Sequence, residues 1–138
     1  MRQSTTQITI DTRRQGLVDI TAPIRRWVDA QAMQSGLLTV FCRHTSASLL
    51  IQENAAPEVR TDIEAYFERI APESSSYLHD DEGPDDMPAH IKAMLTGSSL
   101  VVPVADGRPM LGTWQGLFLA EHRRRPHQRA VVAHVAGD

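Results

Sequence analysis

Apolar and polar residues alternate with a period of two near the start of the chain, which is the pattern of half-buried strands. Two such runs, residues 5–11 and 16–20, are separated by a polar stretch that predicts a hairpin loop. A dense apolar run at 37–42 predicts a buried strand, and extended structure resumes at 48–52. These four segments therefore favour strands.

Apolar residues spaced three to four positions apart predict two longer helices. The first is capped by Thr21 and ends before Gly36, and the second is capped by Asn54 with Pro57 in its first turn. The core face of the second helix is predicted to hold Val59, Ile63, Tyr66, Phe67 and Ile70.

Residues 72–88 follow neither pattern, because they are polar, acidic and interrupted by glycine and proline. We expect a long loop here, and long loops in compact domains are usually either functional or disordered. A short third helix follows, capped by Asp86, opened by Pro88 and terminated by Gly97.

The last third of the chain again predicts strands, and the pair Asp106-Gly107 is a strong hairpin signal between the first two of them. The four strands are expected at 98–105, 108–112, 117–121 and 130–135. The element order indicates one α+β domain over residues 1–138, a largely antiparallel β-sandwich with two to three helices.

Composition and charge support this picture without adding a partner. The 138 residues are 41% hydrophobic and 22% charged with a net charge of −3, so neither nucleic acid nor an anionic membrane is an expected partner. Cys42, the only cysteine, excludes a disulfide within the chain and is read as a small buried hydrophobe. The first residues lack the apolar core of a signal peptide, so we expect a cytoplasmic protein.

Histidines carry the candidate chemistry. His90 lies near the start of the third helix beside Asp86, and His79 shares the acidic loop with Glu82. Imidazoles with nearby carboxylates are ligands of zinc, manganese or iron, so we predict a divalent metal site, with Glu82 as a general base. The alternative is that neither histidine binds a metal. His90 is then a surface residue near a helix start, and His79 is a solvated loop residue.

A third histidine, His44, follows the buried strand directly and precedes Thr45, Ser46 and Ser48. These hydroxyls are candidates for an oxyanion or phosphate cradle, and they fit a simple turn equally well.

Two later segments add candidates. Gln115 and Trp114 lie between Gly112 and Gly116, where a bulge could aim Gln115 into a site, while Trp114 is expected in the core. In Glu121-His122-Arg123, alternation lets at most one of the first two residues enter a given site, and Arg123 is a candidate phosphate ligand.

Several of these segments, taken in order, resemble the YjbQ-like family over nearly the whole chain. They are Arg43-His44-Thr45-Ser46-Ala47-Ser48, Asn54, Tyr77-x-His79, Glu82-Gly83-x-Asp85-Asp86-Met87-Pro88-x-His90-Ile91-Lys92, Gly112-Thr113-Trp114-Gln115-Gly116 and Glu121-His122-Arg123. Arg43 departs from the glutamine of close relatives, and this departure does not touch the expected ligands.

The resemblance implies a β-sandwich with outer helices that forms a trimer, with pockets at or near the subunit interfaces. It also implies a metal, often zinc, and the family label of secondary thiamine-phosphate synthase. Its polar centre would be His44, His79 and His90, with Asp86, Gln115 and His122 around it and His122 as an alternative ligand.

Three functions follow as expectations. The first is condensation of a pyrimidine diphosphate with a thiazole phosphate, in which the metal, Ser46, Ser48 and Arg123 would bind the diphosphate. The second is metal-dependent hydrolysis of a small phosphorylated metabolite, and the third is a trimer that binds a ligand or metal without catalysis.

Overall fold

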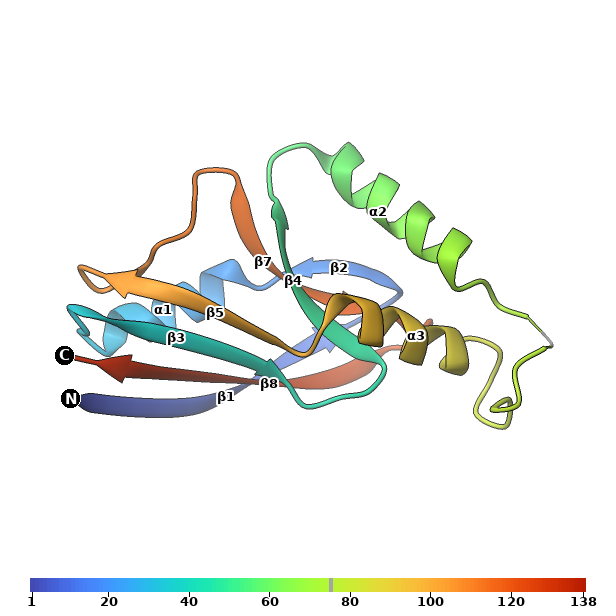
Figure 1. Cartoon of the computed structure of the whole chain (residues 1–138), viewed down its shortest axis with the longest axis horizontal. Helices are drawn as coiled ribbons and strands as arrows, with labels where there is room; N and C mark the ends of the chain where they lie inside the picture. The colour runs from blue at the N-terminus through green and yellow to red at the C-terminus, as the bar shows by residue number, and fades with distance from the viewer. Residues whose placement is uncertain (75) are drawn as a thin grey trace.

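The computed structural model describes residues 1–74 and 76–138, and its strands form two antiparallel sheets (Figure 1). The strands are β1 (Arg2–Thr12), β2 (Gly16–Asp19), β3 (Ser35–Cys42), β4 (Ala47–Glu53), β5 (Ser99–Ala105), β6 (Arg108–Pro109), β7 (Gln115–Glu121) and β8 (His127–Gly137). The five-stranded sheet has the order β1-β8-β3-β5-β6, and the three-stranded sheet has the order β2-β7-β4. The predicted α+β class with antiparallel strands is confirmed.

Strand β7 shows how the layers are built, because its side chains are buried on both faces. Leu117 and Leu119 pack into the core between the two sheets, while Phe118 and Ala120 pack on the opposite side. Side chains alternate along a strand, so a strand covered on both faces has an unbroken apolar sequence. Cys42 lies in the shared core, as predicted, and its burial raises the pKa of the thiol.

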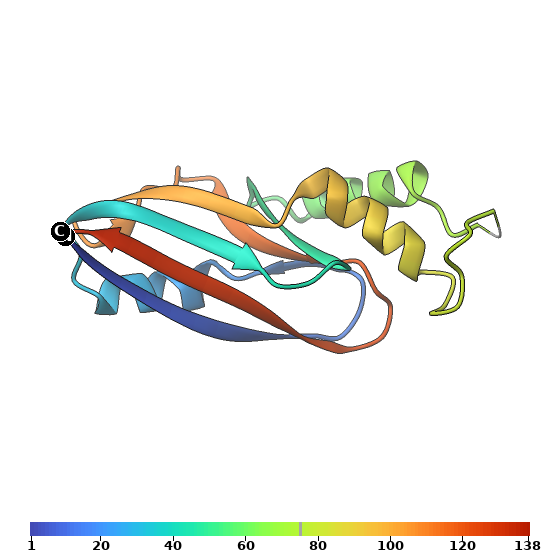
Figure 2. The ribbon, with the colours of Figure 1, turned by 60° about the horizontal axis from the view of Figure 1, so that its bottom comes forward.

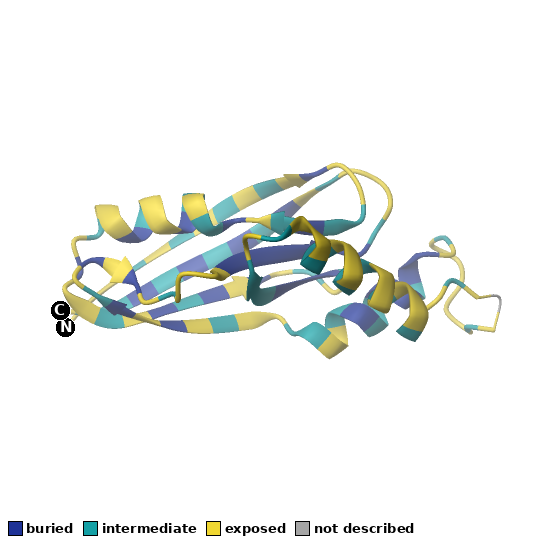
Figure 3. Ribbon diagram, turned by 90° about the horizontal axis from the view of Figure 1, so that it is seen from above, coloured by how far each residue is buried: buried dark blue, intermediate teal, exposed yellow. Residues whose placement is uncertain are grey.

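The helices are α1 (Thr21–Ala30), α2 (Pro57–Ile70) and α3 (Asp86–Thr96). α1 contributes Ile24 and Val28 to the core between the sheets, whereas Ile63 and Phe67 of α2 pack on the outer face of the three-stranded sheet. No residue of α2 is fully buried, and its outer surface is exposed (Figure 3). Tyr66 was wrongly predicted to face the core, because its side chain is 53% exposed. It lies at the edge of the apolar stripe of α2, and the three-stranded sheet covers only the centre of that stripe.

Strand pairing corrects the predicted hairpin at the start of the chain. β1 pairs with β8 and β2 pairs with β7, so the loop after Thr12 carries the chain from one sheet to the other. The predicted hairpin at Asp106-Gly107 is confirmed by the β5–β6 pair, and both residues have the positive φ angles, 51° and 77°, that a tight turn of this kind requires.

The segment between α2 and α3 has no helix or strand over its described residues, as predicted, and Ser75 of this predicted loop lies outside the described residues. α3 has Asp85 as its N-cap, so the predicted cap, Asp86, is the first helical residue instead. The chain ends lie side by side, away from this loop (Figures 1 and 2). None of the helices in the described part of the chain is long and apolar enough to cross a bilayer.

Candidate metal centre

The start of α3 places two potential ligands on one face of the helix. Asp86 and His90 are four residues apart, and residues at this spacing are neighbours on a helix surface. The Nε2 atom of His90 lies 3.2 Å from Oδ2 of Asp86. Because α3 begins at Asp86, both potential ligands lie in the first two turns of the helix.

The loop before α3 brings the third group. Nε2 of His79 lies 2.6 Å from the same Oδ2 atom of Asp86, and the His79 and His90 ring centroids are 5.5 Å apart. One ligand atom from each of His79, Asp86 and His90 falls within 4.8 Å of the others. We call these three residues the metal cluster. The structure therefore brings His79 and His90 together, with the carboxylate between them.

A backbone carbonyl selects the tautomer of His90. Nδ1 of His90 lies 3.0 Å from the carbonyl oxygen of Thr45, and a carbonyl can only accept, so Nδ1–H is the donor. In the neutral ring the lone pair is then on Nε2, which is the nitrogen that faces Asp86. Metal-binding histidines commonly have their other nitrogen held in this way.

The carboxylate at the centre is shielded from water, because the side chain of Asp86 is only 3% exposed. Burial alone would raise its pKa, but hydrogen bonding to His79 and the charges of His90 and Arg123 outweigh burial, so the pKa is lowered. The pKa of His79 is raised, first by its hydrogen bond with Asp86. The cluster therefore keeps an anionic oxygen, and the carboxylate favours the protonated form of His79.

Arg123 fixes the position of the carboxylates. Its Nη1 donates to Asp86 at 2.7 Å, its Nε donates to Asp85 at 3.1 Å, and its Nη2 donates to the backbone carbonyl of Glu82 at 2.7 Å. Because these contacts occupy the guanidinium, the predicted role of Arg123 in phosphate binding is not supported. The exposed carboxylate of Glu82 lies beside the cluster, with Oε2 3.3 Å from Nε2 of His79.

His44 does not join the cluster. Its Nε2 accepts a hydrogen bond of 2.7 Å from the backbone N–H of Ala130, so that nitrogen has no lone pair left for a metal. Burial, followed by the charge of Arg129, lowers the pKa of His44, and the neutral ring then carries its proton on Nδ1. His44 and His90 nevertheless line the same hollow, together with Thr45.

The three predicted phosphate-binding hydroxyls do not form one cradle. Thr45 is exposed and contacts His90 through its backbone, while the hydroxyl of Ser46 accepts from Arg129 at 3.1 Å. Ser48 is fully buried and bonded to His122, so it cannot reach a ligand in the hollow. The sequence placed these residues in one turn, but the entry into β4 directs Ser48 inwards.

Gln115 and Trp114 lie far from the cluster. Gln115 begins β7 and accepts from the backbone N–H of Gly112, whereas Arg123 follows the other end of the strand, about 20 Å away at the rise of an extended chain. Trp114 is 63% exposed, which corrects its expected place in the core. Gly112 lies in the exposed turn before β7, whereas Gly116 is buried within β7, and neither glycine aims Gln115 into the cluster.

His122, the alternative ligand, is also outside the cluster. Its Nε2 is 2.8 Å from the hydroxyl of Ser48, and its ring packs edge-on against Phe67. Burial, followed by the charge of Lys92, lowers the pKa of His122 to about 3. The ring is therefore neutral at physiological pH and contacts a hydroxyl where His79 contacts a carboxylate.

Comparison with known proteins assigns the family. Residues 6–138 match the family model described as UPF0047 protein YjbQ-like. The chain belongs to the YjbQ-like family. It is 49% identical to the UPF0047 protein sll1880 of Synechocystis over 99% of this chain and 94% of that protein, and 42% identical to YjbQ of Escherichia coli over 95% and 96%.

Solved structures agree with the fold of this YjbQ-like chain. The crystal structure of a YjbQ/UPF0047 family protein from Clostridium acetobutylicum has a TM-score of 0.88 at 33% identity, covering 95% of this chain and 99% of that one. The APE1520 protein of Aeropyrum pernix has a TM-score of 0.89 at 29% identity, covering 98% and 99%.

A buried ion pair between Glu121 and Arg129 contacts this YjbQ-like site through the backbone of Arg123. The sequence singled out Glu121 but missed Arg129. The carboxylate of Glu121 accepts from Arg129 and, at 2.7 Å, from Thr12, and also accepts from the backbone N–H of Arg123. Arg129 could have been noticed, because it shares the inward-facing alternation of Val131 in the last strand.

Proposed function

We propose that this protein is a metal-dependent hydrolase of a small phosphorylated metabolite, with a divalent cation held by His79, Asp86 and His90. One observation supports it above all: two imidazoles and a buried carboxylate converge within 4.8 Å, although His79 lies in a loop and the other two lie on α3. Three protein ligands leave further coordination positions for water or substrate.

The donor set fits a metal of intermediate hardness. Two imidazole nitrogens and one carboxylate oxygen suit zinc, and they are compatible with manganese or iron. The Thr45 carbonyl and Arg123 hold His90 and Asp86 in the orientation that coordination needs. When bound, a divalent cation supplies Lewis-acid polarisation of a phosphoryl oxygen and lowers the pKa of water.

The surrounding side chains have separate roles in this proposal. Glu82, exposed beside His79, accepts a proton from the attacking water. His44 donates its Nδ1–H to a substrate oxygen in the hollow that it shares with His90. Arg123 keeps Asp86 ionised and does not contact the substrate.

Condensation of a pyrimidine diphosphate with a thiazole phosphate is the competing enzymatic proposal, since a divalent cation also binds diphosphate. The structure gives it less support because Arg123 and Ser48, two of the groups expected to hold the leaving diphosphate, are engaged within the protein. A binding module without catalysis is the third proposal.

The test combines metal analysis with turnover. Purified protein is assayed for bound metal, for cleavage of small phosphate esters with and without added zinc or manganese, and for condensation of the two thiamine precursors. His90→Ala should abolish metal uptake and ester cleavage with the fold intact, and His127→Ala should leave both unchanged because His127 lies outside the cluster. Tight metal binding without ester cleavage would overturn the hydrolase proposal.

We also propose that the protein is a homo-oligomer, with a trimer expected from the family resemblance. The outer face of the five-stranded sheet carries exposed Leu37, Phe41 and Val101 on the neighbouring strands β3 and β5, and no helix in the described residues contributes to that face. Light scattering should give the mass of several chains, and Phe41→Lys should reduce it. A monomeric wild-type protein would contradict this.

A further inference from the structure

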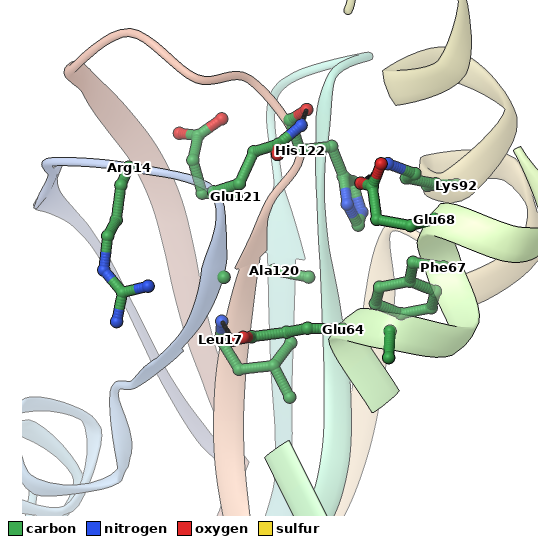
Figure 4. A pocket seen from close by; sticks show the side chains of 12 residues that line it. Arg14, Leu17, Glu64, Phe67, Glu68, Lys92, Ala120, Glu121 and His122 are labelled. Carbon is green, nitrogen blue, oxygen red and sulfur yellow. Dashed lines mark hydrogen bonds and ion pairs between the residues drawn. The ribbon is translucent and has the colours of Figure 1, made fainter. Parts of the chain in front are cut away.

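A second cleft shares no lining residue with the hollow of His44 and His90 and lies between α2 and the strands β2 and β7 (Figure 4). Its volume is about 300 Å³, enough for a small metabolite. Leu17, Phe67 and Ala120 give it an apolar wall. None of the three residues of the metal cluster lines it.

A buried lysine opens into this cleft. Lys92 is only 2% exposed, and its Nζ donates one hydrogen bond, of 2.7 Å, to Oε1 of Glu68. An ammonium group has three N–H donors, and the other two have no side-chain partner among residues 1–74 and 76–138. Buried charges are normally fully hydrogen-bonded, so these donors call for a partner in the cleft.

His122 presents an acceptor to the same space. The hydroxyl of Thr96 donates to the carbonyl of Lys92 at 2.8 Å, so the hydroxyl of Ser48 donates to Thr96 at 2.5 Å and accepts from Nε2–H of His122 at 2.8 Å. The neutral ring then has its lone pair on Nδ1, and that lone pair has no partner within the described part of the chain. The His122 side chain is 2% exposed and lines the cleft (Figure 4).

The lining of the cleft also includes one further cation, Arg14, and one further carboxylate, Glu64. Arg14 is exposed at the rim and has no ion pair within the described residues. Glu64 accepts the backbone N–H of Leu17 through Oε1 at 3.0 Å, which leaves Oε2 available. Glu121 is neutralised by Arg129, so Glu64 is the carboxylate available to a ligand.

These groups decide between two classes of ligand. A purely anionic ligand such as phosphate would satisfy Lys92, but it would be repelled by Glu64 and Glu68 and would leave the acceptor of His122 without a donor. A ligand with an acidic group, an amino group and a small apolar body satisfies both sides and also covers the apolar wall.

We propose that this cleft binds a small zwitterion of the α-amino acid class. Its carboxylate accepts hydrogen bonds from Lys92, with Arg14 at the rim, and its ammonium group donates to Glu64, with Nδ1 of His122 as a further acceptor. Its side chain packs on Phe67 and Leu17. The site is independent of the proposed hydrolase activity, because Lys92 follows His90 by two residues and therefore points about 200° away around α3.

The test uses the metal-free and metal-loaded wild-type protein with a panel of free L-α-amino acids, followed by calorimetry. The amino acid that binds best is compared with its deaminated acid and its decarboxylated amine. We expect each single-charge analogue to bind at least about tenfold more weakly, since each lacks one charge-assisted set of hydrogen bonds. No binding by any member of the panel, or equal binding by the deaminated acid, would overturn the proposal.

Matched variants locate the binding within the cleft. Glu64→Gln and Arg14→Gln should each weaken binding by about five- to tenfold, and metal content should stay unchanged. Glu58→Gln on the same helix and Arg13→Gln beside Arg14 are the controls, because neither residue lines the cleft. Equal affinity in Glu64→Gln, Arg14→Gln and both controls would show that the amino acid binds elsewhere and would overturn the proposal.

Discussion

Two histidines near α3 have opposite electrostatic surroundings. His79 in the loop contacts the carboxylate of Asp86, and its pKa is raised. His122 at the end of β7 contacts the hydroxyl of Ser48 in a buried site, and its pKa falls to about 3. The side chain is the same in both places, so the neighbour and the degree of burial decide its protonation.

The difference separates two kinds of chemistry. A histidine beside an anionic oxygen exchanges its proton for a cation, which suits the metal cluster. A neutral histidine beside a hydroxyl keeps one N–H and one lone pair in fixed positions, which suits the recognition of a polar ligand in the cleft. The two regions share α3 but present different faces of it.

The largest expected effect comes from removing the carboxylate that distinguishes the two regions. Asp86→Asn should weaken metal binding by more than about 100-fold, because a neutral amide replaces the anionic ligand between the two imidazoles. The pKa of His79 should fall back towards its ordinary value. Competition with a chelator and an NMR titration measure the two effects, with Asp80→Asn as the control in the same loop.

On the cleft side, Ser48→Ala removes the hydroxyl that His122 contacts. A buried ring nitrogen then loses its partner, so the free energy of unfolding should fall by about 1–3 kcal/mol, while metal affinity stays unchanged. Denaturant unfolding measures it, and Thr45→Ala, which removes an exposed hydroxyl, should change stability by less than about 0.5 kcal/mol. Equal stability in both variants would contradict the role of Ser48.

Metal binding should depend on pH through His79 and not through His122. Because the pKa of His79 is raised, lowering the pH through that pKa makes the metal displace a proton, and affinity should fall by about tenfold per pH unit. In the metal-free protein the sign reverses. The His79–Asp86 contact stabilises the fold below the ordinary histidine pKa and loses that contribution as pH rises through the raised pKa.

His122 stays neutral over this whole range, since its pKa is about 3. Calorimetric titration with zinc from about pH 8 to about pH 6 checks the dependence. A flat profile would show that His79 holds no proton in the metal-free cluster.

The smallest effect is expected at the far end of β7. Gln115→Ala should change metal affinity and turnover by less than about twofold, because about 20 Å of strand separates Gln115 from the residues beside the cluster. A large loss would show instead that Gln115 of a neighbouring copy reaches the site, which an assay at several protein concentrations would reveal.

By itself, the sequence determined the elements of this protein and the residue types of its site. Period-two and helical patterns predicted the strands and the three helices, because an element that buries one face has apolar residues at a regular local spacing. The pair Asp106-Gly107 predicted the β5–β6 hairpin. The acidic loop and the helix start after it brought His79, Asp86 and His90 into consideration, since they lie close together along the chain.

Only the tertiary structure decided which candidates share a site. Local spacing does not state that β1 pairs with β8, that the N–H of Ala130 occupies His44, or that Asp85 and Asp86 occupy Arg123. It also does not reveal the cleft, whose Arg14, Lys92 and His122 come from three distant segments. Hydrogen-bond capacity is limited, so the partner that folding brings nearest determines whether a side chain can still bind a ligand.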